Sequence, residues 1–243
     1  MHDGKTISVV FPAYNEEAGI VSVIEDFRST GIVDEILVIN NNSNDDTAHR
    51  ALGAGARVVS ESSQGYGHAL RRGLAEATGD YIVLCEPDGT FRAKDLLKLL
   101  AYAPDFIMVC GTRTTPEMIW DTANMGWFLR FGNIVVAKLL EVLYGTPSLS
   151  DCGCTFRLIR ADAARVLARD LTVGGSHFLP EMVILCVRHN FPFIEIPVVY
   201  RGRIGHSKIT GTLKGAVKTG LNMIGLMVSY RLGIGSSNGS GSP

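Results

Sequence analysis

The stretch "ISVVFPAYNEEAGIVSVIEDFRSTGIVDEILVI" (residues 7–39) contains two apolar runs separated by an amphipathic segment. This pattern predicts strands at 7–11 and 35–39 with a helix at 16–29 between them. Two strands joined through a helix pair in parallel. The same alternation continues, with helices predicted at 45–54 and 67–77 and strands at 57–59, 81–85 and 105–110. The chain is therefore predicted to be an α/β protein with a mostly parallel sheet covered by helices on both faces.

Size and charge narrow the class of protein further. The chain has 243 residues, 46% of them hydrophobic, which is enough for one large α/β domain. The formal net charge of -1 gives no general basic field, so we expect no nucleic-acid partner. The first residues, "MHDGKTISVVFPAYNEE", lack the basic start of a secretory signal, which predicts a cytoplasmic protein. Five cysteines in mainly apolar surroundings are expected to be reduced.

Polar loops follow three of the predicted strands. They are "PAYNEE" (12–17), "NNNSNDDT" (40–47) and "EPDGTF" (86–91). Ligands of parallel sheets bind at the carboxyl ends of the strands, so we expect these loops to form one site. Glu86 and Asp88 stand one residue apart and suit a divalent cation held together with substrate phosphates, although "PDG" is also common turn chemistry.

The phosphate-binding motifs of common nucleotide folds are absent from the sequence. No G-x-G-x-x-G follows the first strand, and no G-x-x-x-x-G-K-[ST] occurs. The segment "SQGYGHALRRG" (63–73) offers another arrangement, because Gly67 allows close approach of a ligand and Arg71 could reach a phosphate. The alternative is a plain loop with a solvated basic face.

Several of these segments together resemble a known enzyme family. "SVVFPAYNEEAGI", "EILVINNNSNDDT", "GYGHALRRGLAEATGDYIVLCEPDGTF" and "FIEIPVVYRGRIGHSK" are similar to glycosyltransferase family 2, which has the Rossmann-like GT-A fold. The resemblance runs from about residue 7 to 208 and is strongest to the branch of dolichyl-phosphate mannose synthase and polyprenyl-phosphate sugar transferases. It implies that Glu86-Pro87-Asp88 replaces the family's D-x-D motif, which binds Mg²⁺ or Mn²⁺ on the diphosphate of a nucleotide sugar.

The resemblance also implies roles on the donor side. Pro12, Tyr14 and Glu16 match the loop that holds the base and ribose. Asn41 stands where the family usually has an aspartate that reads the base, so a GDP-linked and a UDP-linked donor both stay open. Thr90 occupies a position where close relatives often have a further metal ligand.

The second half resembles the family's acceptor side. Arg113 belongs to a G-x-R segment that opens a long loop at 111–127. Asp151 and Arg157 match a pair near the site of transfer, or they form a simple ion pair. Glu181 matches an acidic residue that faces the acceptor, where a general base is needed for a hydroxyl but not for a lipid phosphate.

Basic residues and an amphipathic helix end the chain. Arg201, Arg203 and Lys208 match a segment that covers the donor diphosphate or acceptor phosphate, with a solvated basic loop as the alternative. Helices are predicted at 127–144 and 211–233. The uncharged part of the second, 219–230, is shorter than the ~20 residues needed to span a bilayer, so it lies on a membrane surface or packs on the domain. Residues 235–243 are expected to be a flexible tail.

The sequence thus predicts one domain, residues 1–234, with a nucleotide-sugar half at about 1–110 and an acceptor half at about 111–210. The predicted activity is that of an inverting, metal-dependent glycosyltransferase, with a polyprenyl or dolichyl phosphate as acceptor at the cytoplasmic face of a membrane. Two alternatives remain at this point. One is the same donor chemistry with a hydroxyl acceptor, and the other is a nucleotide-sugar binding protein without activity.

Overall fold

A computed structural model describes residues 1–123, 125–205 and 213–233 of the chain. These residues build a seven-stranded sheet with the strand order β3-β2-β1-β4-β6-β5-β7. Every neighbouring pair is parallel except the two pairs that β6 makes. The strands are β1 (Ile7–Ala13), β2 (Glu35–Asn40), β3 (Arg57–Ser60), β4 (Tyr81–Leu84), β5 (Met108–Thr112), β6 (Arg157–Arg160) and β7 (Phe193–Pro197).

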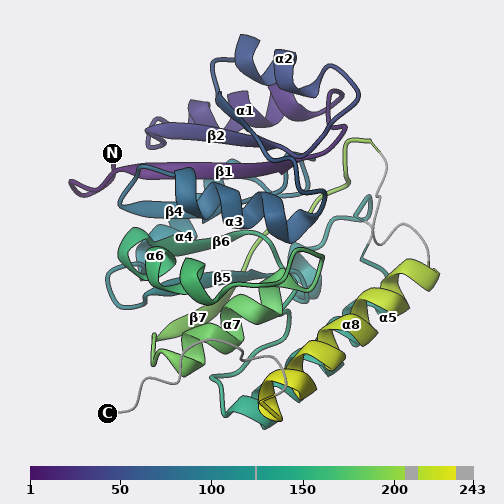
Figure 1. The fold of residues 1–243 in the computed structure, drawn as a ribbon. Helices are drawn as coiled ribbons and strands as arrows, with labels where there is room; N and C mark the ends of the chain where they lie inside the picture. Colours follow the sequence, from purple (N-terminus) through teal and green to yellow (C-terminus); the bar gives the residue numbers. More distant parts are fainter. Residues whose placement is uncertain (124, 206–212, 234–243) are drawn as a thin grey trace.

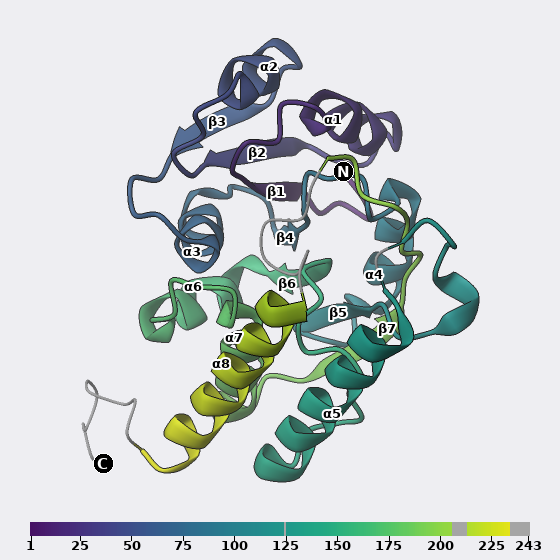
Figure 2. The same ribbon diagram turned by 90° about the vertical axis from the view of Figure 1, so that its right-hand side faces the viewer.

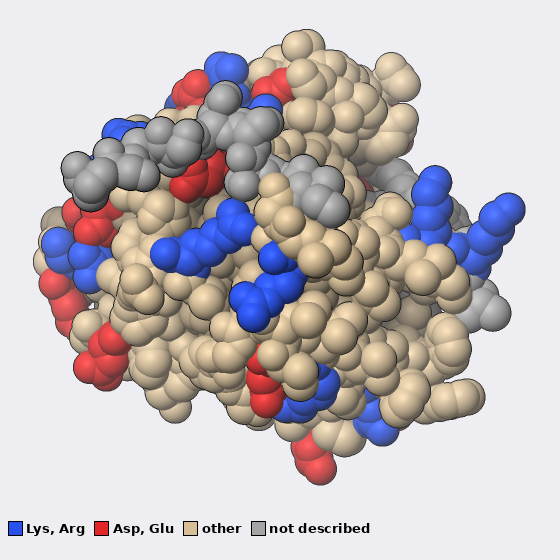
Figure 3. Space-filling view, turned by 60° about the horizontal axis from the view of Figure 1, so that its bottom comes forward, with Lys and Arg blue, Asp and Glu red and all other residues tan. Residues whose placement is uncertain are grey.

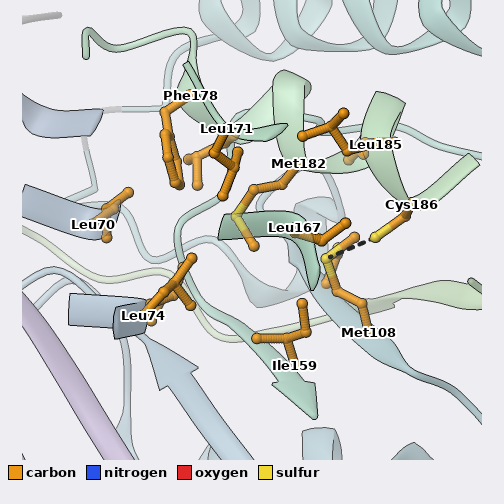
Figure 4. Close-up of a cluster of buried hydrophobic side chains, with 14 of the residues drawn as sticks. Leu70, Leu74, Met108, Ile159, Leu167, Leu171, Phe178, Met182, Leu185 and Cys186 are labelled. Atoms are coloured by element: carbon orange, nitrogen blue, oxygen red, sulfur yellow. Dashed lines mark hydrogen bonds between the residues drawn. The ribbon is translucent and has the colours of Figure 1, made fainter. Parts of the chain in front are cut away.

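Helices cover both faces of this sheet, as predicted (Figure 1). Successive strand residues point to opposite faces, so Val10 belongs to one core while Val9 and Phe11 belong to the other. One face is covered by α3 (Tyr66–Glu76), α6 (Ala161–Asp170) and α7 (Phe178–Arg188). The other is covered by α1 (Ile20–Ser29), α2 (Thr47–Gly53) and α4 (Leu96–Tyr102). Figure 4 shows part of the first core, where Leu70 and Leu74 of α3 lie near Ile159 of β6.

Two further helices, α5 (Trp127–Tyr144) and α8 (Leu213–Arg231), lie side by side next to the sheet (Figure 2). The Tyr144 hydroxyl of α5 donates to the Met227 carbonyl of α8 at 2.7 Å, and Met227 is fully buried. Both helices therefore belong to the packed structure while one side of each faces outward. Among the described residues, no helix combines the length and apolar character needed to cross a membrane.

The structure corrects several expectations about local structure. The first helix begins at Ile20 rather than at residue 16, because Asn15 has a φ of 53° and the following residues form a turn in which the Glu16 carbonyl accepts from Gly19 and Ile20. Strands β6 and β7 and helices α4, α6 and α7 were not predicted. Residues 111–112, predicted to open the long loop, form the end of β5, and within the loop Trp120 donates its N–H to the Tyr200 carbonyl at 2.9 Å. The predicted tail at 235–243 lies outside the described residues.

All five cysteines are free and buried, as expected. Burial raises the pKa of the Cys110 thiol to about 11 and that of Cys152 to about 12, so both are neutral at physiological pH.

Candidate functional site

A cavity of about 600 Å³ opens where the strands end. Its walls come from the loops after β1, β2, β4, β5 and β7, from the segment before the antiparallel β6, and from α5 and α8. One end is polar and is lined by Pro12, Tyr14, Glu16, Asn41, Glu86, Arg113 and Arg203. The other end lies between α5 and α8 and is lined by Phe128, Leu129, Val136, Val217, Leu221 and Ile224. The polar loops after β1, β2 and β4 therefore meet at one site, as predicted.

Asp88 is held rigidly at the polar end. Its side chain is fully buried, and Oδ1 accepts from the Thr90 N–H at 3.0 Å and the Thr90 hydroxyl at 2.6 Å. Gly89 makes the intervening turn with a φ of 75°, a conformation that favours glycine. The Thr90 hydroxyl thus orients Asp88 and is already engaged in that contact. No described residue donates a well-aligned hydrogen bond to Oδ2 of Asp88.

Glu86 lies beside Asp88, and the pKa of its carboxyl group is raised. Burial first, and then the charge of Asp88, raise its pKa to about 7. Thr155 donates its hydroxyl to Glu86 Oε1 at 3.1 Å. In the metal-free protein, Glu86 is therefore only partly ionised at neutral pH.

These two acids fit a divalent cation that is shared with a phosphate ligand. Both provide hard oxygen donors, and the buried Oδ2 of Asp88 receives no well-aligned hydrogen bond, only an ion-pair contact from Arg203. The described residues contain no group of three or more His, Cys, Asp or Glu arranged to hold a metal. Such a cation would therefore depend on oxygens of a bound diphosphate to complete its coordination.

The two arginines of the basic segment after β7 line different pockets. Arg203 lines the cavity, with Nη1 at 2.8 Å from Asp88 Oδ2 and Nη2 at 2.6 Å from Glu16 Oε1. Arg201 faces a separate pocket, where it lies 3.6 Å from Asp26 and donates to the Phe91 carbonyl. The expectation that Arg201 contacts the donor is therefore not met. Lys208 lies outside the described residues.

The first-strand loop lines the polar end of the cavity. Pro12, Tyr14 and Glu16 all contribute to the cavity wall, and the Tyr14 side chain is 37% exposed. A partly exposed aromatic ring next to a polar wall suits stacking with a nucleotide base.

Asn41 also reaches the cavity, but its amide is already engaged. Its Nδ2 donates to the carbonyls of Glu61 at 3.0 Å and Ser63 at 2.8 Å, and its Oδ1 accepts from the Gly65 N–H at 2.7 Å. Asn41 is 3% exposed. In the described state it fixes the loop between β3 and α3, so direct reading of a base by this side chain would require these bonds to break.

Gly67 and Arg71 do not line the cavity, which corrects their predicted role. A Cβ at Gly67 would lie 2.3 Å from the Val173 carbonyl, so the glycine is needed for the close approach of α3 to that loop. Arg71 donates to the Leu171 carbonyl at 3.2 Å. Both residues stabilise the contact of α3 with the loop before α7.

Arg113 is the second cation of the cavity, and Asp151 positions it. Asp151 is fully buried and accepts from Arg113 Nε at 2.7 Å and Nη2 at 2.9 Å. The backbone N–H of Asp151 donates to Glu195 at 2.8 Å. The bidentate geometry fixes the guanidinium plane. Asp151 therefore acts through Arg113 and does not line the cavity itself.

Arg157 is buried and does not pair with Asp151, so the simple ion pair considered from the sequence is wrong. Its guanidinium donates to three backbone carbonyls, those of Cys152, Cys154 and Leu179. These bonds connect the start of β6 to α7. Arg157 therefore supports the segment that carries Gly153 and Thr155 into the cavity.

Glu181 does not face the cavity, and this is the main correction to the predicted site. It is fully buried, and it accepts from the Thr172 N–H at 3.0 Å and the Thr172 hydroxyl at 2.7 Å. It also accepts from the Val173 N–H at 3.0 Å and the Tyr230 hydroxyl of α8 at 2.5 Å. A carboxylate with four donors and no access to the cavity cannot act as a general base in this arrangement.

Sequence reasoning missed two tyrosines of the site. Tyr66 lines the cavity next to Glu86 and contacts the Thr155 hydroxyl, and burial raises its pKa well above the ordinary value. Tyr200 lines it below Arg113, whose guanidinium carbon lies 5.5 Å from the ring centre. The signal for Tyr66 was present in "GYGH", where an aromatic residue stands between two glycines.

Comparisons with known proteins agree with this geometry. Residues 8–167 match the model of the family described as glycosyl transferase family 2. An uncharacterized glycosyltransferase of Mycobacterium tuberculosis is 30% identical over 217 residues, which are 88% of this chain and 94% of that protein. A dolichyl-phosphate beta-glucosyltransferase of Trichomonas vaginalis is 27% identical over 94% of this chain and 75% of that protein.

A solved structure shares the fold. The crystal structure of glucosyl-3-phosphoglycerate synthase from Mycobacterium tuberculosis with Mn²⁺, UDP-glucose and phosphoglyceric acid superimposes with a TM-score of 0.73 at 24% identity, covering 96% of this chain and 82% of that one. Over a shorter segment of 95 residues, 35% of this chain and 29% of the relative, the sequence of that enzyme is 46% identical.

Proposed function

This chain belongs to glycosyltransferase family 2, and we propose that it transfers a sugar from a UDP-linked donor to a polyprenyl or dolichyl phosphate. In this proposal Mg²⁺ or Mn²⁺ binds at Glu86 and Asp88. The observation that carries it is the cavity, which joins an acidic and basic end at the strands to an apolar end between α5 and α8. The enzyme class follows from the family, so the alternative of a sugar-nucleotide binder without activity is not favoured.

The polar end suits a nucleotide diphosphate. Arg113 and Arg203 present guanidinium groups that can each bind phosphate oxygens in a bidentate way. Tyr14 offers a ring to the base. The structural relative binds UDP-glucose together with Mn²⁺, which supports UDP as the nucleotide of this chain as well. When bound, the metal would neutralise charge on the departing diphosphate.

The acceptor end favours a phosphate over a hydroxyl. Among the described residues, the carboxylates that line the cavity are Glu16 and Glu86, and both lie at the donor end. Glu181 is occupied by its four donors. A hydroxyl acceptor needs a base, whereas a lipid phosphate is already anionic. Its oxygen can attack the anomeric carbon directly, forming the new C–O bond while the bond to the diphosphate breaks, with inversion at that carbon.

The outer surface of α5 and α8 supports a lipid acceptor held at a membrane. Trp127 and Phe131 of α5 are 76% and 61% exposed, and Leu221 of α8 is 63% exposed. Lys214 and Lys218 are exposed on α8, which contains no acidic residue. Figure 3 shows a face of the molecule with broad uncharged areas that carry several basic groups, while acidic groups lie at its left and lower edge. Exposed apolar side chains beside lysines are typical of helices that lie in an anionic membrane interface.

A hydroxyl acceptor is the second candidate, because one segment is 46% identical to a glucosyl-3-phosphoglycerate synthase. The experiment that separates the two uses purified protein, Mn²⁺ and labelled UDP-sugars. Each donor is offered with a polyprenyl phosphate extract and, separately, with 3-phosphoglycerate. We expect label in the organic phase, and label found only in a water-soluble product would replace the lipid acceptor by the hydroxyl one.

A further inference from the structure

The Arg203 guanidinium occupies the open side of Asp88. Its Nη1 lies 2.8 Å from Oδ2, the oxygen that receives no well-aligned hydrogen bond from any described residue. On its other side, Nη2 lies 2.6 Å from Glu16 Oε1. One cation thus bridges the carboxylate of the candidate metal site and a carboxylate of the first-strand loop.

We infer that Arg203 acts as an internal counter-ion of Asp88 and must leave this position before a divalent metal can bind there. The inference rests on the metal role of Asp88 in the proposed function. It adds an order to the binding events: metal binds weakly alone and binds well once a diphosphate offers Arg203 another partner.

Charge and burial explain why the two cations exclude each other. Asp88 is fully buried and Thr90 uses its other oxygen, so Oδ2 is the only atom left for a metal. A metal at Oδ2 would lie within a few ångströms of the guanidinium, and repulsion between cations is strong where water is scarce. Burial disfavours the charge of Arg203, but the carboxylates of Asp88, Glu16 and Glu86 outweigh it and raise its pKa.

The backbone holds the segment in place while the side chain is free to change partners. Ile204 donates its N–H to the Asp88 carbonyl at 2.8 Å, and Arg201 donates its N–H to the Thr90 carbonyl at 2.8 Å. Arg203 therefore stays next to the metal site in either state. A diphosphate offers oxygens of the same chemistry as Glu16 and Asp88, so the guanidinium can exchange one anion for another.

The test measures metal binding without donor or acceptor. Free Mn²⁺ is followed by electron paramagnetic resonance as Mn²⁺ is titrated into the wild type, Arg203→Gln and Arg201→Gln. Arg201 is the matched control, because it is two residues away but faces Asp26 in the separate pocket. We expect Arg203→Gln to bind Mn²⁺ at least about tenfold more tightly than the wild type, and Arg201→Gln to stay within about twofold.

A repeat with UDP tests the exchange of partners. UDP should tighten Mn²⁺ binding more in the wild type than in Arg203→Gln, because only the wild type gains a contact between Arg203 and the diphosphate. If folded Arg203→Gln binds Mn²⁺ no more tightly than the wild type in the absence of UDP, the inference is wrong.

A second variant covers the case in which Arg203→Gln does not fold. Arg203→Lys keeps the charge but holds one carboxylate at a time, so it should bind Mn²⁺ more tightly than the wild type, and equal or weaker binding would overturn the inference. No acceptor is present in any of these titrations. A failed lipid acceptor would therefore leave their result unchanged.

Discussion

Replacing Trp127, Phe131 and Leu221 together by serine removes strongly exposed apolar surface from α5 and α8. These side chains are 76%, 61% and 63% exposed, so they contribute little to the core. The fold should therefore survive the triple substitution. What should change is the affinity of the protein for a membrane.

The size of the effect follows from the exposed area. With aromatic side chains of roughly 150–250 Å² and the exposed fractions above, each residue presents on the order of 100–150 Å². If about half of that enters the acyl boundary at about 25 cal/mol per Å², each contributes about 1–2 kcal/mol, or about 4–6 kcal/mol together. Since about 1.4 kcal/mol is a factor of ten, we expect vesicle affinity to fall at least about a hundredfold.

The assay is flotation with vesicles that contain anionic lipid. The matched control is the pair Leu52→Ser and Leu97→Ser, which changes side chains that are 56% and 51% exposed on α2 and α4. The control should float like the wild type, and the triple variant should stay in the soluble fraction with an unchanged melting temperature. Equal flotation of wild type and triple variant would refute the membrane role of α5 and α8.

Three other substitutions test single residues of the site. Asp88→Asn should lower turnover by orders of magnitude while the melting temperature changes little, and full activity in excess chelator would contradict the metal role. Glu181→Gln should lower the free energy of unfolding by about 1–3 kcal/mol, because buried donors lose a charged acceptor. It should have little effect on kcat. A loss of kcat in a variant of wild-type stability would instead indicate that Glu181 is a general base. Glu86→Gln should remove a pH dependence: the raised pKa of about 7 means the metal-free folded wild type holds more protons than the unfolded chain, so its stability falls as pH rises from about 4.5 to 7. Denaturant titrations at pH 4.5 and pH 7 measure the free energy of unfolding. If it changes by the same amount between these pH values in wild type and variant, the pKa of Glu86 is not raised in the folded protein.

The first half of the fold was predictable because its elements have strong local patterns. The apolar runs that became β1, β2 and β4 are continuous and are bounded by polar loops, as buried parallel strands are. The second half was harder. β6 has four residues, "RLIR", with a fully buried Arg157 among them, so its sequence does not look like a core strand.

Parts of the site were predictable for the same reason and others were not. The position of Glu86 and Asp88 followed from the end of a clear strand. The structure places Glu86 in the wall of the cavity, and Asp88 is buried in an ion pair with Arg203, which lines the same cavity. The partners of Glu181 could not be foreseen, because they come from the loop at Thr172 and Val173 and from Tyr230, which is 49 residues away in the chain. Side-chain partners across such distances are set by tertiary packing and leave no local pattern.

A competition between two lipids tests whether the acceptor attacks through a phosphate or a hydroxyl. A polyprenyl phosphate and the polyprenol of the same chain length, which carries a hydroxyl in place of the phosphate, are presented in identical vesicles with labelled UDP-sugar and Mn²⁺. We expect label to enter the lipid phase with the phosphate alone, because the described cavity offers an apolar path but no base on the acceptor side. Comparable transfer to the polyprenol would contradict it.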